Sequence, residues 1–202
     1  NFLQAVETEL GNDALKDLTL NTGGSSTYTM YTDNSFVSEI AAGSALVKPK
    51  NYDVDTLEHH IAAAYIAAPV LKKVDRPEIP LSPAVSAVLR WTGFLPSQGA
   101  FIYGGNWLAK PVYPRETEQV RLHGRSSNQE LYGFPKDTKI EEDDYIFLRP
   151  TQSESVFRQF GHIAIYENGK ISDWWSVFQE EHNEGNSADS LLESAQKRSY
   201  RL

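Results

Sequence analysis

One short stretch of the chain combines residue types that can hold a phosphate group. An apolar run at residues 18–20 leads into a glycine pair and a cluster of hydroxyls, with Gly23, Gly24, Ser25, Thr27 and Tyr28 as the candidate binding residues. Glycines lack a Cβ, so their backbone can approach a ligand closely and direct successive N–H groups at an anion. The order predicts a strand that ends in a phosphate cradle. The alternative is an ordinary loop, because the same residues are common turn formers.

The spacing excludes two familiar phosphate motifs. The glycines follow neither the dinucleotide-binding pattern nor the P-loop pattern, and no Lys-Ser or Lys-Thr pair comes after them. The chain has no cysteine, so disulfides, thiolate nucleophiles and cysteine-bearing metal sites are excluded within this sequence. Adjacent histidines, His59 and His60, would project about 100° apart on a helix and are interpreted as a surface pair. His123 and His162 are weaker candidates for a pocket.

None of the lysines between residues 48 and 170 has a recognisable site around it. They have polar or strand-end surroundings and are interpreted as solvated surface residues. They are Lys48, Lys50, Lys72, Lys73, Lys110, Lys136, Lys139 and Lys170.

Composition limits the class of protein. The 202 residues include 40% hydrophobic residues, enough to bury a core, and the formal net charge is −8. This acidic balance argues against nucleic acid or an anionic membrane as the main partner. Because no apolar run approaches the roughly 20 residues of a membrane span, we expect a soluble protein. The absence of cysteine fits a cytoplasmic location. The first residue is Asn rather than Met, and we expect the chain to be the C-terminal part of a longer protein.

The elements around the glycine pair follow the order of a β/α barrel. Apolar residues at helical spacing in 1–17 predict a helix that ends at Gly11, and a strand is expected at 18–21. Helix, strand and phosphate loop in this order are typical of the last unit of such a barrel, although one unit cannot close it. Further on, Asp55 and Glu58 form a possible capping box that predicts a helix through His60.

The rest of the chain has the pattern of a β domain. Pro69 interrupts the apolar run 61–71, so its second half is interpreted as a strand. Asn168-Gly169 suits the two positive φ angles of a type I′ turn and predicts a hairpin. After residue 179 the composition turns polar, and a helix is expected at 188–197. Further short strands are predicted at 85–91, 100–102, 112–113, 145–148, 163–166 and 170–175. We therefore predict a boundary near residue 75, with a barrel remnant at 1–75 and a β domain with a polar tail at 76–202.

Several ordered motifs resemble one enzyme family. The segment 22–28, followed by the Glu-x-x-x-Gly segment from Glu39 to Gly43, is similar to the C-terminal half of D-threonine aldolases and D-serine dehydratases. The passage 143–154 resembles the family's sequence of turn, strand, proline and metal-ligand pair. The hairpin through Asn168-Gly169 matches the expected ending. The resemblance covers roughly residues 15–178.

This resemblance implies a fold, a cofactor and an assembly. The family has the alanine racemase fold type and binds pyridoxal 5′-phosphate. The chain would then hold the last α/β unit of a TIM-type barrel and a mainly β, alanine racemase-like C-terminal barrel. The family's lysine that binds the cofactor covalently has no counterpart here, so the segment alone is expected to be inactive. A homodimer is also implied, because the β domain commonly completes the partner's active site.

The resemblance also implies a metal site, with a departure. The family's ligands are a His and, two residues on, a Cys or Asp; Gln152 and Glu154 stand at the matching positions. Glu154 could bind a hard divalent ion, whereas an amide oxygen is a poor zinc ligand. Manganese or magnesium would therefore be preferred over zinc. The alternative is that both side chains only form hydrogen bonds in a substrate pocket or cap a loop.

Together these features predict part of a lyase that acts on small D-β-hydroxy amino acids, by retro-aldol cleavage or by elimination. One alternative is an amino-acid racemase, which needs a second proton donor on the opposite face of the cofactor. The other is a β-rich binding module without catalytic activity.

Overall fold

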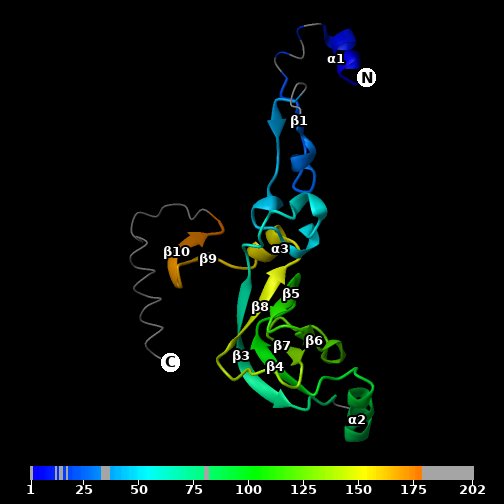
Figure 1. Cartoon of the computed structure of the whole chain (residues 1–202), viewed down its shortest axis with the longest axis vertical. Coiled ribbons are helices and arrows are strands. Elements are labelled where there is room, and N and C mark those ends of the chain that lie inside the picture. The colour runs from blue at the N-terminus through cyan, green and yellow to red at the C-terminus, as the bar shows by residue number, and fades with distance from the viewer. Residues whose placement is uncertain are drawn as a thin grey trace. The chain divides into compact units, whose positions relative to one another are not determined.

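The computed structural model describes residues 2–11, 13, 16, 18–32, 37–79 and 82–178 (Figure 1). The chain divides into two compact units, Asn1–Val156 and Phe157–Leu202. The helix expected at 188–197 lies outside the described residues. None of the helices in the described ranges is long and apolar enough to cross a membrane.

The first unit is organised by a six-stranded antiparallel sheet with the strand order β5-β8-β3-β4-β7-β6. The edge strands β5 and β6 come near each other, so the sheet is a nearly closed barrel. This confirms the prediction of a mainly β chain. In chain order the strands are β3 (Ile66–Asp75), β4 (Gln98–Tyr103), β5 (Ala109–Tyr113), β6 (Glu118–Gln119), β7 (Gln129–Phe134) and β8 (Tyr145–Pro150).

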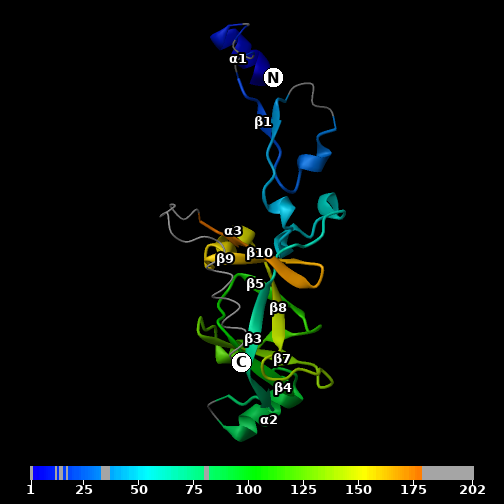
Figure 2. The same ribbon diagram turned by 90° about the vertical axis from the view of Figure 1, so that its left-hand side faces the viewer.

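Strand β3 lies at the centre of the sheet and connects its two halves (Figure 2). Ile66, Ala68 and Val70 alternate with more exposed residues and are buried in the core, as expected for a strand with one buried face. Pro69 lacks an N–H group. It is the last residue of β3 that pairs with β8, and from Val70 onwards β3 pairs with β4. The strand predicted in the second half of the run 61–71 is therefore confirmed, and it extends further, to Asp75. The domain boundary near residue 75 stays a prediction, and β3 already belongs to the sheet.

The N-terminal segment forms short elements. Helix α1 (Phe2–Leu10) confirms the first predicted helix. It ends at Gly11, whose φ of +96° suits glycine. The strand expected at 18–21 is shorter and lies later, at β1 (Asn21–Thr22), which pairs in parallel with β2 (Glu39–Ile40). Because each strand of this pair has only two residues, the apolar run at 18–20 does not mark where β1 begins, and the predicted bounds are wrong.

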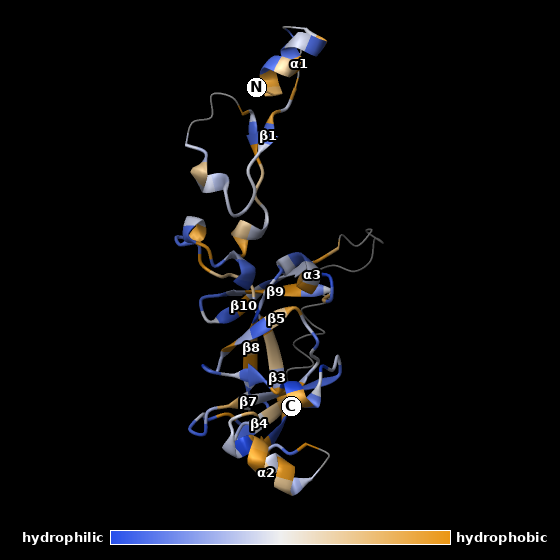
Figure 3. Cartoon of the chain, turned by 90° about the vertical axis from the view of Figure 1, so that its right-hand side faces the viewer, coloured by the Kyte–Doolittle hydropathy of each residue, from blue (hydrophilic) through white to orange (hydrophobic). Residues whose placement is uncertain are grey.

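The strand predicted at 85–91 is wrong, because this segment forms helix α2 (Pro83–Trp91). The Ser82 hydroxyl accepts a hydrogen bond from the Ala84 N–H at 3.2 Å, and Pro83 occupies the first turn. Both are helix-start signals. The apolar residues Val85, Val88 and Trp91 are exposed, so α2 is strongly apolar in Figure 3 without that face being in the core.

The helix predicted from Asp55 to His60 is also wrong. Only one 3-10 turn forms, at Asp55–Leu57, and no side chain caps it. The Lys48 ammonium donates to the carbonyls of Leu57 at 2.7 Å and His60 at 2.8 Å. These bonds satisfy the carbonyls at the end of the turn. Lys48 is half-buried and structural, which corrects its interpretation as a solvated lysine.

The guanidinium of Arg149 on β8 fixes residues 48–53 to the end of the sheet. Its Nη2 donates to the Lys48 carbonyl at 2.7 Å and to Asp53 Oδ1 at 2.6 Å. The Arg149 side chain is only 11% exposed. This contact, together with the Lys50 ammonium, lowers the pKa of Asp53 to about 2. The segment that follows the glycine pair is therefore anchored to the sheet by charge-assisted hydrogen bonds.

A buried carboxylate holds one end of the sheet together. Glu130 on β7 is fully buried and accepts hydrogen bonds from Arg125 Nε at 2.6 Å, Gln119 Nε2 at 2.7 Å and the Tyr132 hydroxyl at 3.0 Å. A Cβ on Gly105 would lie 2.6 Å from Glu130 Cβ. The Gly104-Gly105 pair after β4 is thus a site of close backbone approach.

The second unit contains one described hairpin, formed by β9 (His162–Glu167) and β10 (Lys170–Ser176). Helix α3 (Ser153–Phe157) precedes it in the chain. Asn168 and Gly169 have φ angles of +51° and +83°, as a type I′ turn requires. This confirms the hairpin prediction.

The hydrogen bonds to Glu130 predict that Arg125 contributes strongly to stability, although its side chain is partly exposed. Replacing Arg125 by Ala leaves the buried carboxylate without its cation, which should lower the free energy of unfolding by about 3 kcal/mol. Urea denaturation followed by circular dichroism measures this value. Arg121→Ala, at an exposed arginine nearby, is the control and should change it by less than about 0.5 kcal/mol. Equal effects of the two variants would contradict the structural role of the pair.

The low pKa of Asp53 predicts a pH-dependent contribution to stability. Because the folded pKa of about 2 lies below the ordinary 3.8, ionised Asp53 stabilises the fold above pH 4, and this contribution is lost as the pH falls towards 2. Asp53→Asn should therefore cost about 1 kcal/mol at pH 6, a modest value because Asp53 is partly exposed. Urea midpoints at pH 6, 4 and 2 should converge between wild type and variant. A difference that is constant over this range would refute the assignment.

Candidate functional site

The candidate site is an open hollow of about 600 Å³ in the first unit. It brings together three parts of the sequence: the glycine pair, the segment after β2 and the first turn of α3. The lining residues are Gly24, Ser25, Ile40, Ala41, Ala42, Gly43, Ser44 and Glu154. The structure thus places two residues of the predicted cradle beside one residue of the predicted metal pair.

The backbone turn after Gly24 has the donors that an anion needs. The Gly24 carbonyl accepts from the N–H groups of Thr27 at 3.0 Å and Tyr28 at 2.9 Å. Within the described part of the chain, the N–H groups of Gly24, Ser25 and Ser26 have no hydrogen-bond partner. Gly24 has a φ of +153°, which favours glycine. These features fit the phosphate group of a cofactor, bound by main-chain N–H groups rather than by a cation.

The other predicted cradle residues support the turn and do not line the hollow. Gly23 has a φ of +90°, and a Cβ there would lie 3.0 Å from Ile40 Cγ2, so glycine allows β2 to approach. The Thr27 N–H closes the turn on Gly24. The Tyr28 hydroxyl lies 2.5 Å from His60 Nε2, and Tyr28 does not line the hollow. Phosphate binding by these residues stays a prediction.

The Ser25 hydroxyl connects the cradle to the next segment. Its oxygen accepts from the N–H groups of Gly43 at 3.2 Å and Ala45 at 3.0 Å. A serine hydroxyl can still donate its own hydrogen when its oxygen accepts. Ser25 therefore fixes the 3-10 turn Ser44–Leu46 against the glycine pair and keeps one donor for a ligand.

The acidic end of the hollow is formed by Ser44 and Glu154. The Ser44 hydroxyl donates a short hydrogen bond to Glu154 Oε1. This bond, together with the main-chain and Ser153 donors at the start of α3, holds the pKa of Glu154 below its usual range. Glu154 is therefore ionised at neutral pH. It is also the one charged residue among those that line the hollow.

The described residues do not fit a chelated metal ion at the predicted pair. Gln152 is exposed and is not among the residues that line the hollow. Its carbonyl accepts from the Ser155 hydroxyl at 3.3 Å. Over the described ranges, no group of three His, Cys, Asp or Glu side chains could hold a metal ion. Metal binding by Gln152 and Glu154 stays a prediction, and the structure brings only Glu154 to the site.

The histidine candidates lie elsewhere in the structure. The rings of His59 and His60 are 4.6 Å apart between centroids, and His60 contacts Tyr28. His123 Nε2 lies 3.0 Å from the Glu78 carbonyl. None of these three lines the hollow at Gly24.

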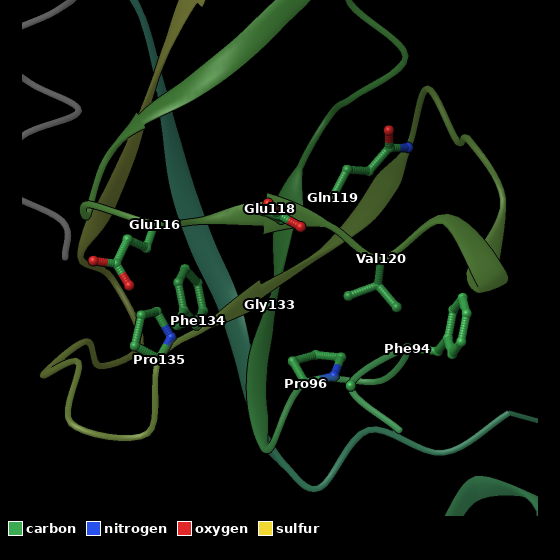
Figure 4. Close-up of a pocket in the computed structure, with 10 residues that line it drawn as sticks. Phe94, Pro96, Glu116, Glu118, Gln119, Val120, Gly133, Phe134 and Pro135 are labelled. Carbon is green, nitrogen blue, oxygen red and sulfur yellow. The ribbon is translucent and has the colours of Figure 1, made fainter. Parts of the chain in front are cut away.

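A smaller hollow of about 230 Å³ lies on the sheet, beside strand β6 (Figure 4). Its lining is mixed. The apolar part comes from Phe94, Pro96, Val120, Phe134 and Pro135, and the polar part comes from Glu116, Glu118 and Gln119. It contains none of the residues that the sequence singled out for chemistry.

Sequence reasoning missed Ser44 as a site residue. The signal was available, since Ser44 directly follows the Glu-x-x-x-Gly segment from Glu39 to Gly43. Its contact with Glu154 joins residues that are far apart in the sequence, and no local pattern predicts such a contact.

Comparison with known proteins supports the fold and no closer relationship. No protein-family model matches the sequence, and no curated protein matches it. Among solved structures, D-threonine aldolase from Filomicrobium marinum superposes with a TM-score of 0.57 over 79% of this chain, at 13% sequence identity.

The chain shares its fold with part of a D-threonine aldolase. It spans 40% of the length of that protein. At this level of identity the likeness shows the fold alone, and it agrees with the mainly β, barrel-like sheet described above.

The Ser44 hydrogen bond predicts the protonation behaviour of Glu154. In Ser44→Ala the carboxylate loses its strongest donor, so the pKa of Glu154 should rise towards its ordinary value. Carboxyl ¹³C NMR titration of the side chain measures the shift. Ser155→Ala is the matched control, because the Ser155 hydroxyl donates to Gln152 instead. A pKa that is unchanged in Ser44→Ala would show that this bond does not form in solution.

Proposed function

We propose that this chain is part of a pyridoxal 5′-phosphate-dependent lyase that cleaves small D-β-hydroxy amino acids, as a D-threonine aldolase or a D-serine dehydratase does. The observation that carries the proposal is the hollow in which the unpaired N–H groups of Gly24 and Ser25 lie together with the carboxylate of Glu154. The fold shared with part of a D-threonine aldolase supports it. Because the chain spans 40% of that protein, the activity belongs to the complete protein, for which we propose a homodimer.

The residues of the hollow divide into two ends with opposite preferences. The main-chain N–H groups at Gly24 and Ser25 favour an anion. The Glu154 carboxylate repels one, so the phosphate lies at the glycine end. Glu154 then faces the amino-acid end, where an ionised carboxylate can accept a hydrogen bond from an ammonium or a β-hydroxyl group of the substrate.

The bound cofactor supplies the electron sink for cleavage at the α-carbon. The chain's own contribution is to position the reactants. Ser25 holds the segment 43–45 against the cradle, and Ser44 orients the Glu154 carboxylate and keeps it ionised. In retro-aldol cleavage, an ionised, oriented carboxylate can accept the proton of the β-hydroxyl group as the Cα–Cβ bond breaks.

Charge repulsion at Gly24 tests the cradle. The side chains introduced by Gly24→Asp and Gly24→Asn have the same size and strain the backbone equally. Only the aspartate carries a negative charge. Two unit charges about 4 Å apart repel by roughly 1–4 kcal/mol near a protein surface. The affinity of the complete protein for pyridoxal phosphate should therefore fall at least about tenfold further in Gly24→Asp than in Gly24→Asn. Absorbance titration with the cofactor measures both, and equal affinities would refute the phosphate assignment.

Product analysis on the same complete protein separates the four functions considered. Glycine with acetaldehyde from D-threonine indicates an aldolase, and pyruvate with ammonia from D-serine indicates a dehydratase. Formation of the L-enantiomer alone indicates a racemase. A protein that retains the cofactor in no assembly and forms no product is a binding module, and that outcome overturns the proposal.

A further inference from the structure

A second large hollow lies on the sheet, away from the glycine pair and Glu154. Its volume is about 750 Å³, within the range of small-molecule sites. It shares Gly93, Phe94, Glu118 and Gln119 with the smaller hollow of Figure 4 and extends from there to β5. The complete lining is Gly93, Phe94, Ala109, Lys110, Pro111, Thr117, Glu118, Gln119, Arg121, Leu122, Arg125 and Tyr132. We call it the cationic hollow.

The charge of the cationic hollow is opposite in sign to that of the chain. Three of its lining residues are basic, Lys110, Arg121 and Arg125, and one is acidic, Glu118. The buried Glu130 neutralises the charge of Arg125. The remaining charges are the two positive charges of Lys110 and Arg121 and the one negative charge of Glu118, so the lining has a net positive charge. A local positive excess in a chain of net charge −8 attracts anions to this place on the surface.

Arg125 is held in place before any ligand arrives. Its Nε donates to Glu130 Oε1 at 2.6 Å and its Nη2 to the Trp107 carbonyl at 2.8 Å. A guanidinium has five N–H donors, so three remain for a ligand after these two bonds. Because Glu130 is fully buried, the arginine is anchored from inside the sheet, which reduces the entropy lost on binding.

The polar floor of the hollow is fixed by the same carboxylate. Gln119 Nε2 and the Tyr132 hydroxyl both donate to Glu130. Gln119 and Val120 leave the strand in opposite directions (Figure 4). Gln119 lines both hollows, whereas Val120 lines only the smaller one. Phe94, Pro111 and Leu122 add apolar walls. The combination suits a molecule with one acidic group and a small apolar body.

We propose that the cationic hollow binds a small organic anion whose carboxylate or phosphate contacts Arg125, Arg121 and Lys110, with its carbon skeleton against Phe94 and Leu122. The planar guanidinium of Arg125 suits both oxyanions, because it can donate two parallel hydrogen bonds. This site is independent of the lyase proposal, since it shares no residue with the hollow at Gly24.

Isothermal titration calorimetry on the complete protein at low ionic strength tests the proposal with two probes, benzoate and phenyl phosphate. Each should bind saturably, and inorganic phosphate should bind more weakly because it has no apolar body. The double variant Lys110→Gln/Arg121→Gln should weaken the probes at least about tenfold, because two charge-assisted hydrogen bonds are lost. Both residues are exposed, so the fold should be retained, and circular dichroism checks this.

The matched control is Lys136→Gln/Lys139→Gln, which removes the same charge outside the hollow and should change the affinities less than about twofold. Tighter binding of phenyl phosphate assigns a phosphate ligand, and tighter binding of benzoate assigns a carboxylate ligand. Three results overturn the proposal: no saturable binding of either probe, equal weakening by both double variants, or unchanged affinity in Lys110→Gln/Arg121→Gln. The last would show that the probes bind elsewhere, for example at the glycine pair.

Discussion

The Arg149 guanidinium is the contact on which the candidate site depends. It leaves strand β8 and binds the Lys48 carbonyl and the Asp53 carboxylate. Thr151, just after that strand, accepts from the Asn51 N–H through its carbonyl at 3.4 Å. These bonds attach the segment after β2 to the strand that leads into α3. Ser44 and Glu154 lie on these two pieces of chain, so these bonds help to hold the two sides of the hollow together.

Local features of the fold could be predicted from the sequence, and features that depend on distant partners could not. Asn168-Gly169 specifies its own turn, because both residues tolerate positive φ. The short apolar run of α2 fits the spacing of a strand as well as that of a helix, and the helix-start signal at Ser82-Pro83 decides for the helix. Lys48 could not be assigned, since its acceptors belong to a turn that the capping pattern had predicted as a longer helix.

The same distinction applies to the site. A glycine pair followed by hydroxyls predicts donors for an anion, and the unpaired N–H groups of Gly24 and Ser25 agree with that pattern. Residue type does not tell which hydroxyls face a ligand. Ser25 also holds the neighbouring segment, and Tyr28 is directed to His60. Glu154 lies in the first turn of α3 and lines the hollow, whereas Gln152 precedes the helix and does not.

The pairing of β3 has a consequence for how the protein is made. Ile66 lies opposite Leu148, so the central strand cannot complete its pairing until the ribosome has released most of the chain. Closing so long a loop is slow compared with forming a local hairpin. Until then the apolar residues of β3 are unprotected, and premature association with other chains competes with folding. The hollow at Gly24 needs residues that precede β3 and a residue that follows β8, and it is therefore among the last features to form during synthesis.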